Sequence, residues 1–565
     1  REDAADLLDA LARDLGLVTR WGPDRAEFRV QTMLRSYLAA DLQRQGPDRV
    51  AALHRRAARW WDRRSRPAEA LRHASRTADP VVVLDLVRRR AGTLVASGEH
   101  GVLAAALEAV DEAPTADAWR AALSAHLLLH RGDVAGAATA VRRGRRASRA
   151  PGAELRALLT AAEGLAGMEP TPSDDVPPED PALALLARAG RGAAEIGAGS
   201  PARARSDLLA ALDGARRLGL PLLEVQCLSL LGMAAWTAGD LTEAARTTAE
   251  ATAAVRDGGW DRTGPAACVH AVAALTALGR ARPGSAAEAA ESGLRADAAA
   301  LEPQVRFALR VARGGALFDS GEKAAGLLEL QQARAELGEA SVHGGLVAVS
   351  ALVEHRIALR LGYGNAAAAV GVWLAARSGT TQEQLLLRAW TEAAAGAHRA
   401  ARSTVDPLLG RAARPAWSGT VVEAWLVAAH VALQEGDRPA ARQALRTALD
   451  RARALDLVRP FTLSPTAVRA LLVDELVGGH DRGRFAGRIL AVPPPGAWPA
   501  GVVLTGRERD VLSRLPSLLN LDEIAGDLSV SVNTVKSHVQ SIYDKLGAGS
   551  RRRAVLAAHE QGLLR

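Results

Sequence analysis

Residues that could contact nucleic acid are concentrated in the stretch SVSVNTVKSHVQSIYDKLG, residues 529–547. It contains Lys536 and Lys545, whereas the 71 basic residues of the chain are otherwise arginine, except for Lys323. An ammonium group pairs with phosphate oxygens, and hydroxyl and amide side chains can hydrogen-bond the edges of bases. The stretch therefore predicts a surface that binds nucleic acid.

A helix over this stretch separates its apolar and polar residues. With about 100° between successive residues, one face carries four apolar residues that are expected in a core, namely Val535, Val539, Ile542 and Leu546. The other faces carry the candidates for DNA contact, which are Asn533, Thr534, Lys536, Ser537, Gln540, Ser541 and Lys545. Lys545 also lies at the expected end of the helix, where a cation stabilises the helix dipole, so stability is the first role expected for it.

Four residues suited to cap helices indicate the elements around this stretch, and they are Thr505, Asn520, Ser531 and Ser550. The first two are followed three positions later by glutamate, which makes each pair a capping box. Short helices that begin at these four caps, two of them joined by the turn SVS, predict a helix-turn-helix domain over residues 504–565.

The segment LTGRERDVL…NLDEIAGDLSVSVNTVKSHVQSIYDKLGAGSRRRAV resembles the LuxR-type DNA-binding domain, and it fills nearly every position of that signature. The resemblance implies that Thr534 and Lys536 contact double-stranded DNA and that Ser537 and Gln540 face bases. It departs from the family in two places. The usual glycine is absent from PSLLN, and arginines replace the usual acid after Ser550.

The arginines that follow Ser550 leave two interpretations open. Arg551 and Arg552 could clamp DNA phosphates beside the recognition helix, or they could form a solvated corner without a function. Cations at a helix N-terminus oppose the helix dipole, so stability does not explain them. Residues 504–565 hold nine basic and seven acidic side chains, so we expect specificity to need two modules paired on two half-sites.

The long middle of the chain carries a repeat in which a small-residue turn precedes a run of alanine-spaced apolar residues, as in TAGDLTEAARTT and QEGDRPAARQAL. The turn glycines are Gly132, Gly199, Gly239, Gly279, Gly321, Gly362, Gly396 and Gly436. A period of about 40 residues with helix, glycine turn and helix is typical of a helical solenoid. The units resemble tetratricopeptide repeats, and they predict an all-α sensor domain over residues 96–477.

Residues 1–95 resemble the segment that follows the ATPase module in large MalT-like regulators, where a winged-helix end passes into a helical arm. The matching motifs are FR…LRSYL, LHRRAARWW and EALRHA. The resemblance implies that a nucleotide-binding domain precedes Arg1, so the chain is expected to be part of a longer protein. No phosphate-loop sequence G-x-x-x-x-G-K-[ST] occurs around the three lysines, so no cofactor is expected in this chain and ATP or ADP would bind the preceding domain.

Between the repeats and the C-terminal module, residues 478–503 contain PPP and scattered glycines. This composition predicts a linker of partly extended character.

Composition narrows the class of protein. The formal charge of +8 permits nucleic-acid binding, and only Cys227 and Cys268 are present, which excludes a disulfide framework. We find no signal peptide and no long uncharged apolar run, so a cytoplasmic protein without a membrane partner is expected. The two cysteines are expected to pack in the core, although a redox pair is the alternative.

Two histidines one helical turn apart, His126 and His130, could share a metal ion, but no third ligand is apparent, so they are expected to be ordinary helix residues. No arrangement of residues suggests catalysis. The leading hypothesis is a transcriptional activator that binds DNA, recruits RNA polymerase, self-associates and senses an unknown small molecule or protein on its repeats. The alternatives are a protein-binding scaffold and the sensor half of a signalling ATPase.

Overall fold

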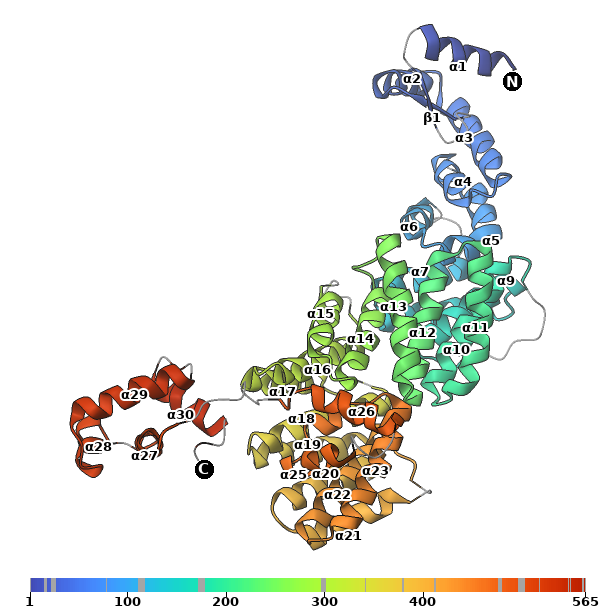
Figure 1. The fold of residues 1–565 in the computed structure, drawn as a ribbon. Helices are drawn as coiled ribbons and strands as arrows, with labels where there is room; N and C mark the ends of the chain where they lie inside the picture. The colour runs from blue at the N-terminus through green and yellow to red at the C-terminus, as the bar shows by residue number, and fades with distance from the viewer. Residues whose placement is uncertain are drawn as a thin grey trace. The chain divides into compact units, whose positions relative to one another are not determined.

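The structure is a computed structural model. It describes residues 2–14, 18–21, 27–77, 79–109, 117–170, 178–295, 301–340, 342–378, 381–410, 413–475, 480–495, 504–517, 519–546, 548, 550–560 and 563. The described residues are helical except for turns and one two-stranded sheet, so the predicted all-α class is confirmed (Figure 1). Contacts divide the chain into two compact units. The first is Arg1–Leu129, Val134–Arg191 and Asp213–Leu223, and the second is His130–Asp133, Gly192–Leu212 and Glu224–Arg565.

The chain begins with a helix and a hairpin, followed by a helical arm. After α1 (Glu2–Asp14), strands β1 (Val18–Trp21) and β2 (Glu27–Val30) pair antiparallel with Val18 opposite Val30. The arm comprises α2 (Thr32–Arg44), α3 (Pro47–Asp62), α4 (Pro67–Ala74), η1 (Ser75–Thr77), α5 (Pro80–Ala96) and α6 (His100–Ala109). Prolines at the first positions of α3, α4 and α5 fit there because those positions have no helical hydrogen bond to lose.

A long series of helices makes up the middle of the chain. They are α7 (Asp117–Arg131), α8 (Val134–Ala147), α9 (Ala153–Leu165), α10 (Pro181–Gly197), α11 (Pro201–Leu218), α12 (Pro221–Ala238), α13 (Leu241–Gly258), α14 (Gly264–Gly279), α15 (Pro283–Leu294), α16 (Pro303–Asp319) and α17 (Lys323–Leu337). The series continues with α18 (Gly344–Arg360), α19 (Gly364–Ser378), α20 (Gln382–Ala394), α21 (His398–Leu409), α22 (Gly419–Gln434), α23 (Arg438–Leu455), α24 (Arg459–Thr462), α25 (Thr466–Glu475) and α26 (His480–Ala491).

The repeat turns depend on glycine in a left-handed conformation. Seven of the eight predicted turn glycines have positive φ, as at Gly239 (87°) and Gly436 (81°), where residues other than glycine are strained. Gly279 is the exception. It ends α14, and the left-handed residue of that turn is Ala281, with φ of 54°. A Cβ atom on Gly279 would lie 2.9 Å from Leu241, so its small size serves helix packing rather than the turn.

The sequence predicts a linker over residues 478–503, but the first half of this stretch is a helix, so the predicted start of the linker is wrong. Residues 480–491 form α26, in which Phe485 and Ile489 are 3 % and 0 % exposed. These two residues lie one helical turn apart and give the segment an apolar face that packs on the repeats, in spite of its glycines. Of the rest of the predicted linker, residues 492–495 are described and are not helical, and residues 478–479 and 496–503 lie outside the described residues.

Burial accounts for the two cysteines and for His126, residues for which the sequence left a redox pair and a metal site as alternatives. It raises the pKa of both thiols, Cys227 and Cys268, to about 12, which keeps them protonated and fits a packing role. The His126 ring bonds the Leu158 carbonyl oxygen at 3.0 Å, and burial lowers its pKa to about 4.

Among the described helices, α12 alone is long and apolar enough to cross a membrane, and 61 % of that span is buried within the protein, as in a core helix.

Candidate nucleic-acid interface

The C-terminal module is built from four short helices around its own apolar core. They are α27 (Gly506–Arg514), α28 (Leu521–Asp527), α29 (Val532–Leu546) and α30 (Arg551–Glu560). The core residues include Val511, Leu512, Ile524, Val535, Ile542 and Ala554. All four residues predicted for the buried face of α29 lie in this core, so the predicted orientation of that helix is confirmed.

Both predicted capping boxes are present and fix where the first two helices start. The Thr505 amide donates to Glu508 at 2.7 Å, and the Glu508 amide donates to the Thr505 hydroxyl at 3.2 Å. In the second box, Asn520 and Glu523 exchange equivalent bonds of 2.7 and 2.9 Å. Each box satisfies two amides that the helix itself leaves without partners.

The turn between α28 and α29 sets the start of the exposed helix. Ser531 accepts a hydrogen bond from the Thr534 amide at 3.1 Å, and the hydroxyls of the two residues lie 2.7 Å apart. Ser529 has φ of 56°, a left-handed conformation that glycine adopts without strain.

Replacing Ser529 by glycine should stabilise the C-terminal module, because glycine adopts this φ freely. We expect a gain of about 0.5–1 kcal/mol in its free energy of unfolding. Hydrogen exchange of the α28 and α29 amides measures the change. Ser529→Ala keeps the strain and serves as the control, so equal protection in the two variants would contradict this account of the turn.

The exposed side of α29 presents polar and basic groups to solvent. Asn533, Thr534, Lys536, Ser537 and Gln540 are all exposed. Within the described part of the chain, the Lys536 ammonium group has no ion pair. The Gln540 amide nitrogen donates to Asp544 at 2.9 Å.

Two other candidates on α29, Ser541 and Lys545, bond to Glu508 of α27. Lys545 Nζ lies 2.7 Å from each Glu508 carboxylate oxygen, and the Ser541 hydroxyl donates to Oε1 at 2.7 Å. Hydrogen bonding by Lys545, and then by Ser541 and the Thr505 amide, lowers the pKa of Glu508 to about 2. DNA contact by Ser541 and Lys545 stays a prediction, and the structure gives them a role in joining two helices.

Arg551 also has partners inside the module. Its guanidinium group donates to the backbone carbonyl oxygens of Leu515, Ser517 and Leu519 at 2.9, 2.8 and 2.6 Å. These bonds tie the start of α30 to the loop between α27 and α28, a role that neither interpretation of the sequence contained. Arg552 and Arg553 are exposed, so both of these cations face solvent at the start of α30.

The sequence did not reveal Glu508 as the residue that joins α27 to α29, because its capping role alone explained it. The only sequence indication is the spacing of Ser541 and Lys545, which lie one helical turn apart on the edge of α29.

These four helices, with a capped and solvent-facing helix after a three-residue turn, define a helix-turn-helix DNA-binding domain. Residues 502–558 match the family model of bacterial regulatory proteins, luxR family. The C-terminal domain of this chain is therefore a LuxR-family domain.

Relatives similar to part of this chain include transcriptional regulators. It is 41 % identical over 96 residues to the probable transcriptional regulatory protein NarL of Mycobacterium tuberculosis, which covers 17 % of this chain and 40 % of NarL. It is 49 % identical over 61 residues to the transcriptional regulatory protein YdfI of Bacillus subtilis, covering 11 % of this chain and 29 % of YdfI. It is 42 % identical over 57 residues to the HTH-type transcriptional regulator MalT of Serratia proteamaculans, covering 10 % of this chain and 6 % of MalT.

The chain thus spans less than half the length of these relatives. Among solved structures, yeast Tom70 is similar over 79 % of this chain and 96 % of its own, with a TM-score of 0.34 and 11 % identity. The helical architecture rests on the elements described above.

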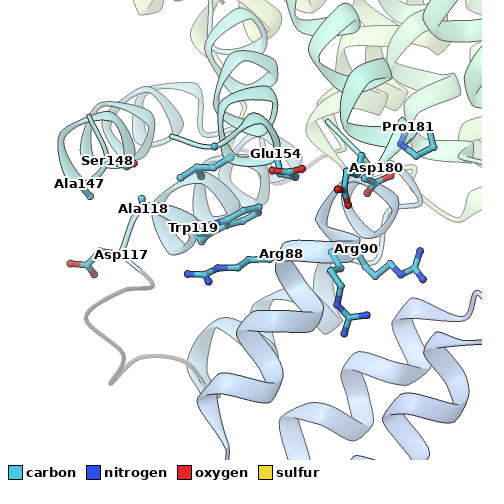
Figure 2. A pocket seen from close by; sticks show the side chains of 14 residues that line it. Arg88, Arg90, Asp117, Ala118, Trp119, Ala147, Ser148, Glu154, Asp180 and Pro181 are labelled. Carbon is cyan, nitrogen blue, oxygen red and sulfur yellow. The ribbon is translucent and has the colours of Figure 1, made fainter. Parts of the chain in front are cut away.

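The first unit contains a hollow of about 770 Å³ that could hold a small molecule (Figure 2). Arg88 from α5, Trp119 from α7 and Glu154 from α9 line it. Arg89 and Arg90 also line it, but both are paired with Asp62 at 2.7 and 2.8 Å. Within the described residues, Arg88 and Glu154 have no ion pair, so the hollow places a cation and a carboxylate beside the Trp119 indole ring, and further carboxylates line it at Asp117, Glu179 and Asp180.

Proposed function

We propose that this chain is part of a sequence-specific transcriptional regulator and that α29 is its recognition helix. The observation that carries the proposal is the separation of side chains on α29. Its apolar residues are buried, and its edge residues Ser541 and Lys545 are held by Glu508. Its solvent-facing side chains are an ammonium group, hydroxyls and amides, the types of group that bind phosphates and hydrogen-bond base edges.

The interface we propose consists of residues with exposed side chains, namely Asn533, Thr534, Lys536, Ser537, Gln540 and Arg552. Lys536 and Arg552 meet phosphates, and Ser537 and Gln540 meet base edges in the major groove. Ser541, Lys545 and Arg551 are left out because they are only partly exposed and their side chains bond other parts of the domain, at Glu508 and at the loop between α27 and α28.

The rest of the chain controls this output domain in our proposal. The repeats sense an effector, for which the hollow between α5, α7 and α9 is the candidate site, and the regulator activates transcription in the cytoplasm through self-association and RNA polymerase. The chain itself is not an enzyme, and any ATP or ADP binds outside it. What supports these points is the regulator class of the matched domain and the sequence motifs through which residues 1–95 resemble MalT-like proteins.

Selection of random double-stranded oligonucleotides by the full chain tests the proposal. We expect recovered sequences to share a motif, present as two half-sites whose centres are about 10–10.5 bp or a multiple of it apart, because paired modules bind successive turns of DNA. Recovery of unrelated sequences that bind equally well would instead favour a protein-binding scaffold.

A further inference from the structure

A connecting segment of the second unit is buried, although connecting segments normally lie on the surface. Residues 456–464, DLVRPFTLS, follow α23 and include the single turn α24. Each of these nine residues is buried, and Phe461 is 0 % exposed. We call this segment the strap.

The strap contacts the ends of helices from successive repeats. The Val458 amide donates to the Gly279 carbonyl oxygen of α14 at 3.0 Å. Arg459 forms a two-bond ion pair with Asp319 at the end of α16, at 2.7 and 3.0 Å, across 140 positions in the sequence. Arg356 of α18 donates to the Leu463 carbonyl oxygen at 3.0 Å.

These contacts differ from those of an open helical solenoid, in which each repeat contacts only its neighbours and its curvature can change gradually. One segment here binds three repeats at once. Its charges are also buried, since the Arg459 and Asp319 side chains are each 7 % exposed. Separation of such a pair leaves both charges without compensation, so the strap is either fully seated or released.

The strap is also tied to the last helix before the DNA-binding domain. Asp456 pairs with Arg280, at the end of α14, and with Arg488 of α26, both at 2.7 Å. The Asp456 carboxylate therefore connects the end of α14, the strap and α26.

We infer that the strap, residues 456–464, acts as an internal latch. While it is seated, it fixes the curvature of the repeats from α14 to α23, so this curvature can change only when the strap is released. Release also frees Asp456 from Arg280 and so loosens α26, which leads along the chain to α27.

Hydrogen exchange of the full chain under increasing urea tests the latch. In the unchanged protein, we expect the strap amides and the ends of α14, α16 and α18 to exchange through one shared opening. In Arg459→Ala, strap and α26 amides should exchange about tenfold faster or more, while α22 keeps its protection. Arg482→Ala, which breaks an exposed pair with Asp450, is the matched control and should change neither.

Two outcomes overturn the inference. Strap amides that exchange independently of the helix ends in the unchanged protein would show an ordinary loop. A uniform rise in exchange over all repeats in Arg459→Ala would show a general stabilising residue. If Arg459→Ala does not fold, Arg280→Ala replaces it, because Asp456 then keeps Arg488 and only the tie to α14 is lost.

Discussion

Lys536→Ala is expected to weaken binding to the selected DNA about tenfold and to lower the slope of log affinity against log salt by about 1. The reason is that its ammonium group is exposed and meets a phosphate in the proposed interface. The loss should be similar for specific and unrelated DNA, since phosphate contacts carry no sequence information. Fluorescence anisotropy at several salt concentrations measures both quantities.

Substitutions of the neutral neighbours should behave differently. Ser537→Ala and Gln540→Ala are expected to relax the preference for particular bases with the salt slope unchanged. Arg514→Ala is the control for charge alone, because Arg514 is exposed in the same domain but pairs with Asp527 on α28. If Lys536→Ala binds as tightly as the unchanged chain at every salt concentration, α29 does not lie in the groove as proposed.

Glu508→Gln is expected to lower the free energy of unfolding of the C-terminal domain by about 1–2 kcal/mol, since the partly exposed Lys545 ammonium group loses its charged partner. Glu508 is 4 % exposed and bonds three groups. No tryptophan lies after Trp498, so hydrogen exchange of α27 and α29 amides is the suitable measurement.

The pH dependence of this contribution has a defined sign. Folding lowers the pKa of Glu508 from 4.5 to about 2, so the unfolded domain takes up this proton more readily than the folded one. The stabilisation is complete above about pH 4.5 and is lost as the pH falls towards 2. Glu508→Gln should remove this part of the acid sensitivity.

Two further variants separate the buried pair from charge in general. Lys545→Met added to Glu508→Gln should recover part of the stability, because no partly buried charge is then left without a partner. Asp510→Asn, which changes an exposed carboxylate on the same helix, should have little effect. Equal losses in Asp510→Asn and Glu508→Gln would refute the special role of Glu508.

The sequence predicted those parts of the domain that depend on local pattern. The apolar face of α29 follows from helical periodicity, and the capping boxes at Thr505 and Asn520 from spacing within one turn. The partners of Lys545 and Arg551 were not predictable, because they lie 37 and 32 to 36 positions away and depend on how helices pack. Composition led to a wrong prediction at α26, because its glycines suggested a linker although Phe485 and Ile489 form a buried apolar face.

The same distinction applies to the repeats. Glycine turns gave the period, but Gly279 proved to be a packing residue and Ala281 the left-handed one. The strap had no sequence indication at all. Its burial depends on Gly279, Asp319 and Arg356, which are distant in sequence and come together only when the repeats curve.

The length of chain between the end of α26 at Ala491 and the start of α27 at Gly506 limits how far the DNA-binding domain can lie from α26. The 15 residue steps between them, 506 minus 491, can span at most about 50 Å even when fully extended. Two recognition helices on successive turns of DNA lie about 34–36 Å apart. In the proposed binding of two copies to paired half-sites, the spacing of the half-sites therefore sets an upper limit on the distance between their α26 helices, and it would constrain which assemblies of the repeats can bind such a site.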